Sequence, residues 1–187
     1  LIASGAESLE AAVIDGGTAP EATTTINSLV GTPGGSEYFM TVNGFRKLAL
    51  VTNTANSRSA GTLAIEDYLE TVKLMGVGGS NAMQKDRVGF IVDMFTHWKS
   101  LELAELKTQD VYSMPTIERG VLTNVYGYDV YTTNNMHRAN QDATYALKAN
   151  TAGKVNLDTA SANTTGSILS VRFDQWQLGY KRNWTFE

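Results

Sequence analysis

The stretch RVGFIVDM, residues 87–94, is the clearest strand signal in the chain. It is short and nearly continuously apolar, which is the pattern of a β-strand buried on both faces. The residues that follow, THWKSLELAELKT (96–108), have helix-forming composition, with Thr96 as the expected N-cap. Their apolar side chains spread around more than one face of that helix, so we expect neighbouring elements to cover it on two sides.

The clearest helix lies before this strand, in TLAIEDYLETVKLMG (62–76). Thr62 is its expected N-cap, and Gly76, followed by Gly78 and Gly79, is its expected end. One face is apolar and is expected to be buried: Ile65, Tyr68, Leu69, Val72 and Met75. The opposite face is expected to be solvated: Glu66, Asp67, Glu70 and Lys73.

The chain begins with another helical pattern. Its apolar stripe consists of Ile2, Ala6, Leu9 and Val13. Gly16 and Gly17 supply the expected helix end, and residues 16–36, rich in Gly, Thr, Pro and Ala, are expected to be a connecting segment. Because no N-cap residue precedes the helix, we interpret the chain as a fragment that begins inside it.

The stretch EYFMTVNGFRKLALV (37–51) admits two interpretations. Asn43-Gly44 between apolar runs is a signal for a β-hairpin. The spacing of Phe45, Leu48 and Ala49 is also compatible with a helix. Both interpretations stay open on the sequence alone.

The pattern changes to β-structure further along the chain. GVLTNVYGYDVYTTNNM (120–136) contains two β-rich runs broken at Gly127, and the second run alternates in character, so two strands are predicted. Residues 137–166 are polar and rich in Asn, Thr and Ala, and are expected to be a long surface loop or a set of edge strands.

The closing residues FDQWQLGYKRNWTFE (173–187) combine aromatic and basic side chains. On a strand of period two, one apolar face consists of Trp176, Leu178, Tyr180, Trp184 and Phe186. We favour a strand that packs this face against the core. A base-stacking surface for nucleic acid and a subunit interface are the two alternatives.

The composition narrows the class of protein. The 187 residues suggest one domain or two small ones, and a chain of this size buries about 70% of its unfolded surface. The formal net charge of −4 argues against a dedicated nucleic-acid binder, which usually carries a basic excess. The chain has no Cys for disulfides or thiolate metal sites. No apolar run approaches the length that a membrane helix needs.

No catalytic, cofactor or metal site is predicted. His97 and His137 lack a second ligand at metal-binding spacing. The acidic residues Glu66, Asp67 and Glu70 are interpreted as the solvated face of a helix rather than as an acid/base pair. The Gly-rich pieces lack the endings of phosphate-binding or dinucleotide-binding loops. These residues indicate a structural or binding role and no enzyme.

Four pieces of the chain, in order, resemble the major capsid (head) protein family of tailed bacteriophages. SLEAAVIDGG (8–17) resembles the end of that family's long spine helix. RVGFIVDMFTHWKSLELAEL (87–106) resembles its apolar strand running into a short helix. LTNVYGYDVYTTNNM (122–136) resembles its β-hairpin, and RFDQWQLGYKRNWTFE (172–187) is similar to its closing segment.

The resemblance implies an α+β fold with two domains. A peripheral domain, a helix plus a long twisted sheet, would take residues 1–112 and the returning strand 173–187. An axial domain, a central sheet with loops, would take residues 113–172. The N-terminal arm, the extended loop and most of the spine helix of the family are not found in this sequence.

The function implied by the resemblance is structural. Subunits of this family assemble into hexamers and pentamers of an icosahedral phage or prophage head that encloses double-stranded DNA without reading its sequence. The implied partners are copies of the chain and other head proteins such as a portal or scaffold, with no membrane, cofactor or small-molecule substrate. The implied location is the virion, and the host cytoplasm before assembly. Lys181 and Arg182 are the expected subunit-contact residues.

Three alternatives remain beside the phage head. An encapsulin-like compartment shell would share the fold and hold protein cargo. A hydrolase would require two carboxyl groups with raised pKa values in one cleft. An adhesin-like binding module is suggested only by the Thr-, Asn- and Gly-rich loops.

Overall fold

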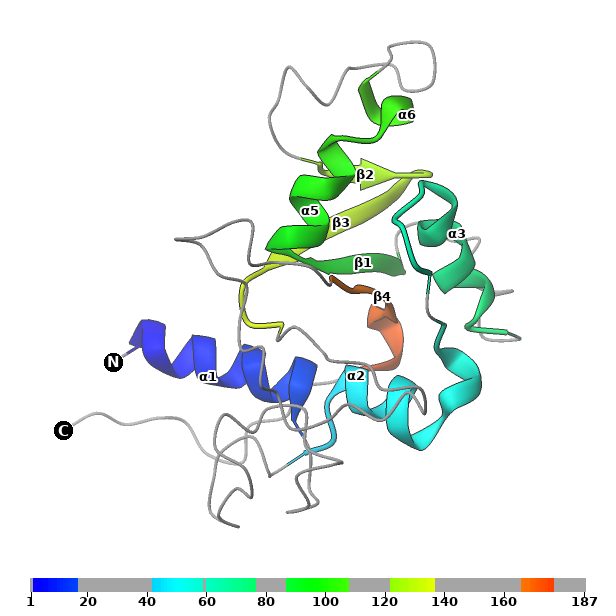
Figure 1. Ribbon diagram of the computed structural model, residues 1–187. Helices are drawn as coiled ribbons and strands as arrows, with labels where there is room; N and C mark the ends of the chain where they lie inside the picture. Colours follow the sequence, from blue (N-terminus) through cyan, green and yellow to red (C-terminus); the bar gives the residue numbers. More distant parts are fainter. Residues whose placement is uncertain are drawn as a thin grey trace, which may run out of the picture.

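The fold is built around a mixed four-stranded sheet (Figure 1). The computed structural model describes residues 2–16, 42–58, 60–76, 87–107, 122–136 and 166–176. The strands are β1 (Val88–Asp93), β2 (Asn124–Val125), β3 (Tyr128–Thr133) and β4 (Ile168–Arg172), in the order β2-β3-β1-β4. β1 pairs parallel with β3 and antiparallel with β4, so the strand predicted from RVGFIVDM is central to the sheet. The chain is therefore a mixed helix-and-sheet protein of the α+β kind.

A tight turn joins β2 to β3 and confirms the two predicted strands. Tyr126 and Gly127 occupy the turn with φ values of 53° and 81°, so both central residues are left-handed, as a type I′ hairpin requires. Gly127 adopts this conformation without a side-chain penalty, which is why the β-rich run breaks there.

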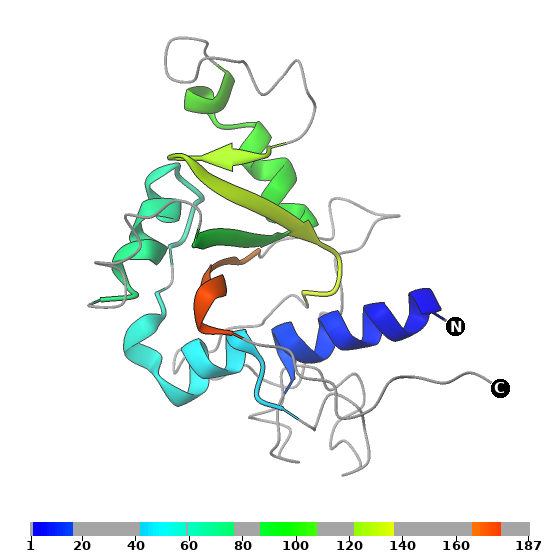
Figure 2. The same cartoon turned by 180° about the vertical axis from the view of Figure 1, so that it is seen from behind.

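One face of the sheet, which we call the closed face, carries Val88, Phe90 and Val92 of β1. Two helices cover it, α3 (Glu66–Lys73) and α5 (Met94–Leu101). α5 lies in front of β3 in Figure 1 and behind it in the reverse view of Figure 2. Among the described residues, ten buried side chains form the core on the closed face: Ile65, Tyr68, Val72, Val88, Phe90, Val92, Leu106, Leu122, Val125 and Val130.

The other face, which we call the open face, carries Gly89 and Ile91 of β1. α1 (Ile2–Asp15) and α2 (Phe45–Lys47) pack against part of it. Among the described residues, four buried side chains form the core on this face: Ile14, Met136, Leu169 and Val171. Tyr131 and Phe173 remain 50% and 40% exposed on the same face. The described residues therefore cover the two sides of the sheet unequally.

α3 confirms the predicted helix with two corrections. Ile65 and not Thr62 occupies the N-cap, and the first turn is closed by the Asp67 carboxylate, which accepts the Ala64 N–H at 2.8 Å. Asp67 is consequently buried, and its assignment to a solvated face was wrong. Ile65, Tyr68 and Val72 are buried as expected.

α5 begins earlier than predicted because its cap is the end of the preceding strand. Asp93 is the N-cap, and its carboxylate accepts the backbone N–H of Thr96 at 2.8 Å and the Thr96 hydroxyl at 2.9 Å. Thr96, the predicted cap, therefore lies in the first turn. The helical stretch also divides in two, because α6 (Ala104–Lys107) starts after a break at Glu102 and Leu103.

The N-terminal half contains two further corrections. The predicted first helix is α1, but Ala6 and Leu9 of its predicted stripe are exposed, whereas Ala11, Ala12 and Ile14 are buried. After Gly44 the chain is helical, with α2 continuing into the π-helical segment η2 (Leu48–Thr52). The hairpin interpretation of Asn43-Gly44 is therefore wrong and the helical one is correct.

Short helical turns complete the described elements: η3 (Thr54–Asn56) and η6 (Phe173–Gln175). The sheet takes β1 from the segment predicted as peripheral and β2, β3 and β4 from the segment predicted as axial. The division at residue 112 stays a prediction. The predicted loop at 137–166 and connecting segment at 16–36 lie outside the described residues except for Gly166 and Gly16.

Candidate functional site

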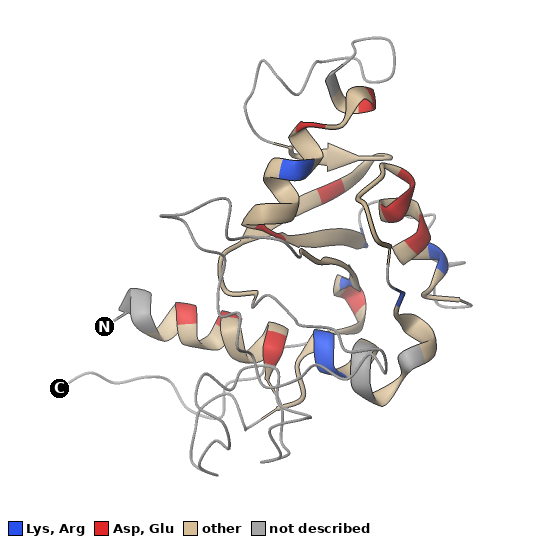
Figure 3. Ribbon diagram, in the orientation of Figure 1, with Lys and Arg blue, Asp and Glu red and all other residues tan. Residues whose placement is uncertain are grey.

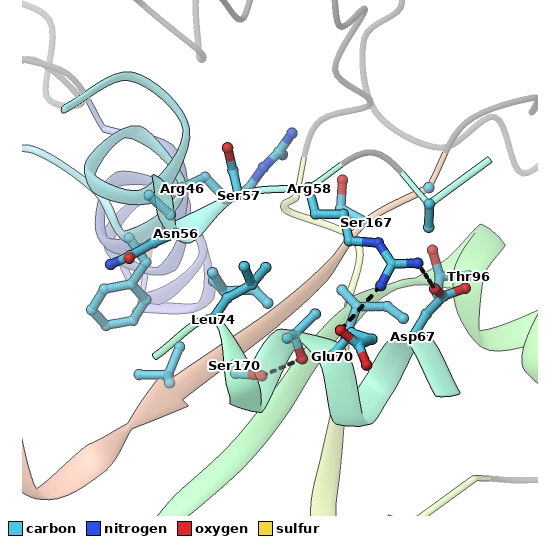
Figure 4. Close-up of a pocket in the computed structure, with 18 of the residues that line it drawn as sticks. Arg46, Asn56, Ser57, Arg58, Asp67, Glu70, Leu74, Thr96, Ser167 and Ser170 are labelled. Atoms are coloured by element: carbon cyan, nitrogen blue, oxygen red, sulfur yellow. Dashed lines mark hydrogen bonds and ion pairs between the residues drawn. The ribbon is translucent and has the colours of Figure 1, made fainter. Parts of the chain in front are cut away.

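A groove of about 1340 Å³ runs along β4. α3 forms one wall, and α2, η2 and the segment that follows them form the other (Figure 4). β4 supplies the floor, because every residue of this strand lines the groove. An edge strand thus lies at the bottom of a cleft between two helical walls.

Hydroxyl groups join the floor to the α3 wall. Thr71 on α3 and Ser170 on β4 share a hydrogen bond (Figure 4). The Thr71 hydroxyl also donates to the carbonyl of Tyr68 at 2.7 Å, which holds it in place on the helix. Below this contact the Tyr68 hydroxyl meets Ser100 at 2.6 Å, and burial raises the pKa of Tyr68 to about 12. The α3 wall is therefore attached to the sheet by polar as well as apolar contacts.

Arg58 is one of the cations that line the groove. Its guanidinium lies 3.3 Å from Asp67 and 3.3 Å from Glu70. Glu70 also pairs with Lys73, and this hydrogen bond, together with the charges of Lys73 and Arg58, lowers the pKa of Glu70. Asp67 and Glu70 of α3 therefore act as ion-pair partners of Arg58.

The other charged residues that line the groove are paired in the same way. Arg46 lies 3.0 Å from Asp15, and both side chains are almost completely buried. Figure 3 shows this acidic end of α1 beside the basic residues of α2. Lys99 pairs with Glu102 at 2.8 Å, and Arg172 pairs with Asp174 at 2.7 Å. Each charged residue lining the described groove thus has an opposite charge within the chain.

One end of the groove is fixed where β4 begins. The Asp93 carboxylate, which caps α5, also accepts the backbone N–H of Ser167. Gly166 lies so close to this cap that an added Cβ would collide with the Thr96 hydroxyl oxygen. The start of β4 is therefore held against the start of α5, and the approach requires glycine.

The other end of the groove is aromatic. Trp176 meets Phe45 edge-to-face, with ring centroids 4.5 Å apart, and remains 47% exposed. The prediction that Trp176 faces the core from a strand was wrong, because Phe173–Gln175 forms a helical turn that ends β4 and turns the next side chain outward. The remaining aromatic residues of the tail lie outside the described residues.

A second, smaller hollow of about 280 Å³ lies on the open face. It is bounded by α1 and β3, with the exposed rings of Tyr131 and Phe173 in edge-to-face contact at 5.6 Å beside it. The Glu10 carboxylate of α1 accepts two hydrogen bonds, one from the Thr133 hydroxyl and one of 2.8 Å from the Asn135 side-chain amide. These bonds hold α1 at the end of β3.

The candidate residues named from the sequence differ in whether the structure describes them and in where it places them. Lys181, Arg182 and His137 lie outside the described residues. His97 is buried on α5, its Nδ1 lies 3.2 Å from the Thr132 hydroxyl, and burial lowers its pKa. No group of three side chains able to hold a metal ion occurs in the parts of the chain that are described.

Sequence reasoning missed the residues that shape the groove. Arg58 lies in a polar stretch without periodicity, so nothing local indicates its contacts with α3. Ser170 alternates within a strand, but its partner Thr71 is 99 positions away. Asp93 carries a readable signal, an Asp followed three residues later by Thr at a strand-to-helix junction.

Comparisons with protein-family models, with curated proteins and with solved structures find no match to this chain. Of the described helices, none has the length and apolar character needed to span a membrane.

Proposed function

We propose that this chain is a structural subunit that assembles with copies of itself into a closed protein shell, of the kind formed by the major capsid proteins of tailed bacteriophages. The observation that carries the proposal is the groove along β4. It combines an edge strand with helical walls that carry apolar side chains and charges that are already paired. Such a surface suits contact with another polypeptide better than it suits chemistry on a small molecule.

The electrostatics of the described residues favour this role over hydrolysis. A hydrolase of the type considered above needs a carboxyl group with a raised pKa. The pKa of Glu70 is lowered by its hydrogen bond to Lys73, and the pKa of Asp174 is lowered by its hydrogen bond to Arg172. Both groups are therefore poor proton donors near neutral pH.

Weak contacts are sufficient for a shell. Each subunit makes several contacts at once, so effective concentration multiplies individually modest affinities. Closed symmetric assembly needs complementary surfaces on the subunit and no active site. In this proposal the peripheral and axial domains divide near residue 112, the shell encloses double-stranded DNA, and Lys181 and Arg182 lie near subunit contacts.

Electron microscopy of the protein expressed in its natural coding context tests the proposal. Closed icosahedral particles, filled with DNA when produced during phage growth, are the expected result. Closed particles that contain a specific protein would instead favour the encapsulin-like compartment. Monomers at every protein and salt concentration would contradict both shell hypotheses.

A further inference from the structure

The hydrogen-bonding pattern of β4 shows which of its backbone groups point into the groove. In an antiparallel pair, residues alternate between those that bond the partner strand and those that point away from it. The Phe173 N–H donates to the Arg87 carbonyl at 2.9 Å, which makes this a bonded position. With the observed register, Val171 and Leu169 also bond β1, whereas the backbone groups of Ile168 and Ser170 point away from it.

The contact of Ser167 with Asp93 agrees with this alternation. Ser167 lies one step beyond Ile168, at a position whose N–H points toward β1, and there it meets the Asp93 carboxylate instead of a backbone carbonyl. In the described parts of the chain, β4 has no strand on its outer side and neither Ile168 nor Ser170 has a backbone partner there. The outer edge of β4 thus offers backbone donors and acceptors to the groove.

The groove determines what kind of partner fits this edge. An added strand would be covered by α3 on one side and by α2 and η2 on the other, where Leu74, Leu48 and Ala49 line the walls. The charged lining residues already have partners within the chain, such as Arg58 with Asp67. A charged partner would lose its hydration without gaining a free counter-charge. The complementary partner is therefore extended and uncharged.

We propose that an extended, uncharged segment of a second copy of this chain adds to β4 as a further strand and fills the groove. This inference rests on the proposed function, because a shell subunit supplies the second copy. Main-chain hydrogen bonds at Ile168 and Ser170 provide the affinity, and the helical walls select against charge. The contact is heterologous, since a groove on one subunit receives a segment of the next.

Residue-resolved amide hydrogen exchange, measured at low and high protein concentration, tests this directly. The N–H groups of Ile168 and Ser170 should exchange at least about tenfold more slowly when the chain associates, because each then donates to the added strand. Leu169 and Val171 are internal controls: they donate to β1 and should be protected at both concentrations.

Three results would overturn the inference, and they separate it from the proposed function. Association without new protection at Ile168 and Ser170 removes this contact and leaves the shell proposal intact. Full protection of both amides in dilute monomer means that the same chain covers the edge. No association at any protein or salt concentration removes the inference and the shell proposal together.

A pair of variants gives a second, independent test. Ser170→Pro and Ser170→Ala both lose the bond to Thr71, but only the proline also removes the outward N–H and places a ring in the groove. Association measured by sedimentation velocity should weaken about tenfold more for Ser170→Pro than for Ser170→Ala. Circular dichroism establishes that both are folded. Equal association of the two variants would contradict strand addition.

The salt dependence tests the uncharged character of the partner. Because the lining charges are paired within the chain, the association constant should change less than about threefold between low and high salt. A steep fall with salt would show that unpaired charges carry the contact and would overturn this part of the inference.

Discussion

The two faces of the sheet differ in how completely the described residues cover them. On the closed face, Phe90 is fully buried and lies edge-to-face with both Tyr68 and Tyr128, at 5.1 Å and 5.7 Å. On the open face, Tyr131 and Phe173 are in a similar ring contact but are about half exposed. Similar aromatic contacts therefore differ in burial: those of Phe90 lie inside a core, whereas the contact of Tyr131 with Phe173 leaves apolar surface exposed.

The largest effect is expected from Phe90→Ala. Loss of a fully buried ring from the closed face should reduce the free energy of unfolding by about 3–5 kcal/mol. The matched change on the open face, Tyr131→Ala, should cost only about 1 kcal/mol, since half of that ring is in water and the main loss is its contact with Phe173. Urea unfolding of both variants measures the difference, and equal losses would mean that the two faces are equally covered.

Asp93→Ala should have the next largest effect. The carboxylate accepts three hydrogen bonds at the junction of β1, α5 and the start of β4, so its removal leaves several buried donors without an acceptor. The expected cost is about 2–3 kcal/mol. Glu102→Ala, which removes an exposed ion pair with Lys99, is the control and should stay within about 0.5 kcal/mol. A small loss for Asp93→Ala in urea unfolding would show that the junction contributes little.

Gly89→Ala tests whether the aromatic side chains on the open face can move to make room for a larger residue. The new Cβ would lie 2.6 Å from the Phe173 ring and 3.0 Å from the Tyr131 ring, so these rings must move. Because both rings are exposed, the cost should be below about 1 kcal/mol. In the double variant Gly89→Ala/Phe173→Ala the clash is removed, and the thermodynamic cycle should show positive coupling. Independent, additive effects would mean that the rings do not confine Gly89.

The smallest effect is expected from His97→Gln, on the pH dependence of the free energy of unfolding. Burial lowers the pKa of His97 below its usual 6.5, so the unfolded chain binds a proton at higher pH than the folded chain does. Above the pKa of the unfolded chain, His97 is neutral in both states and no stability is lost. As pH falls through 6.5 toward the pKa of the folded state, the unfolded chain is protonated first and the free energy of unfolding decreases. Between about pH 7.5 and 5, His97→Gln should therefore lose less stability than the unchanged protein, by under about 1 kcal/mol. Identical pH slopes in urea unfolding would contradict this.

The local sequence pattern was sufficient to predict much of the fold. The central strand, α1, α3 and the β2–β3 turn follow from hydrophobic periodicity and from Gly127, which are short-range signals. The helix starts predicted at Thr62 and Thr96 were wrong, because Ile65 is the N-cap of α3 and Asp93 is the N-cap of α5. In both cases, Asp67 and Asp93, the carboxylate accepts a backbone N–H at 2.8 Å.

The groove could not be derived in the same way. It depends on contact between β4 and α3, which lie far apart in the chain: the bonded residues Thr71 and Ser170 are separated by 99 positions. Periodicity places residues on a face of their own element and contains no information on which other element covers that face. The outward position of Trp176 is a further case. The alternating sequence pattern continues past Arg172, whereas the strand ends there and a helical turn follows.

The position of β4 in the chain has a consequence for the timing of association. β4 follows β1, α5, α6 and the β2–β3 hairpin, so during synthesis it emerges after the other described strands. Until then β1 has an unpaired side and the groove has no floor. Long-range pairing of this kind forms late in folding. A growing chain thus lacks the edge that a second copy would use, so the proposed strand addition requires that the sheet of the receiving subunit is complete.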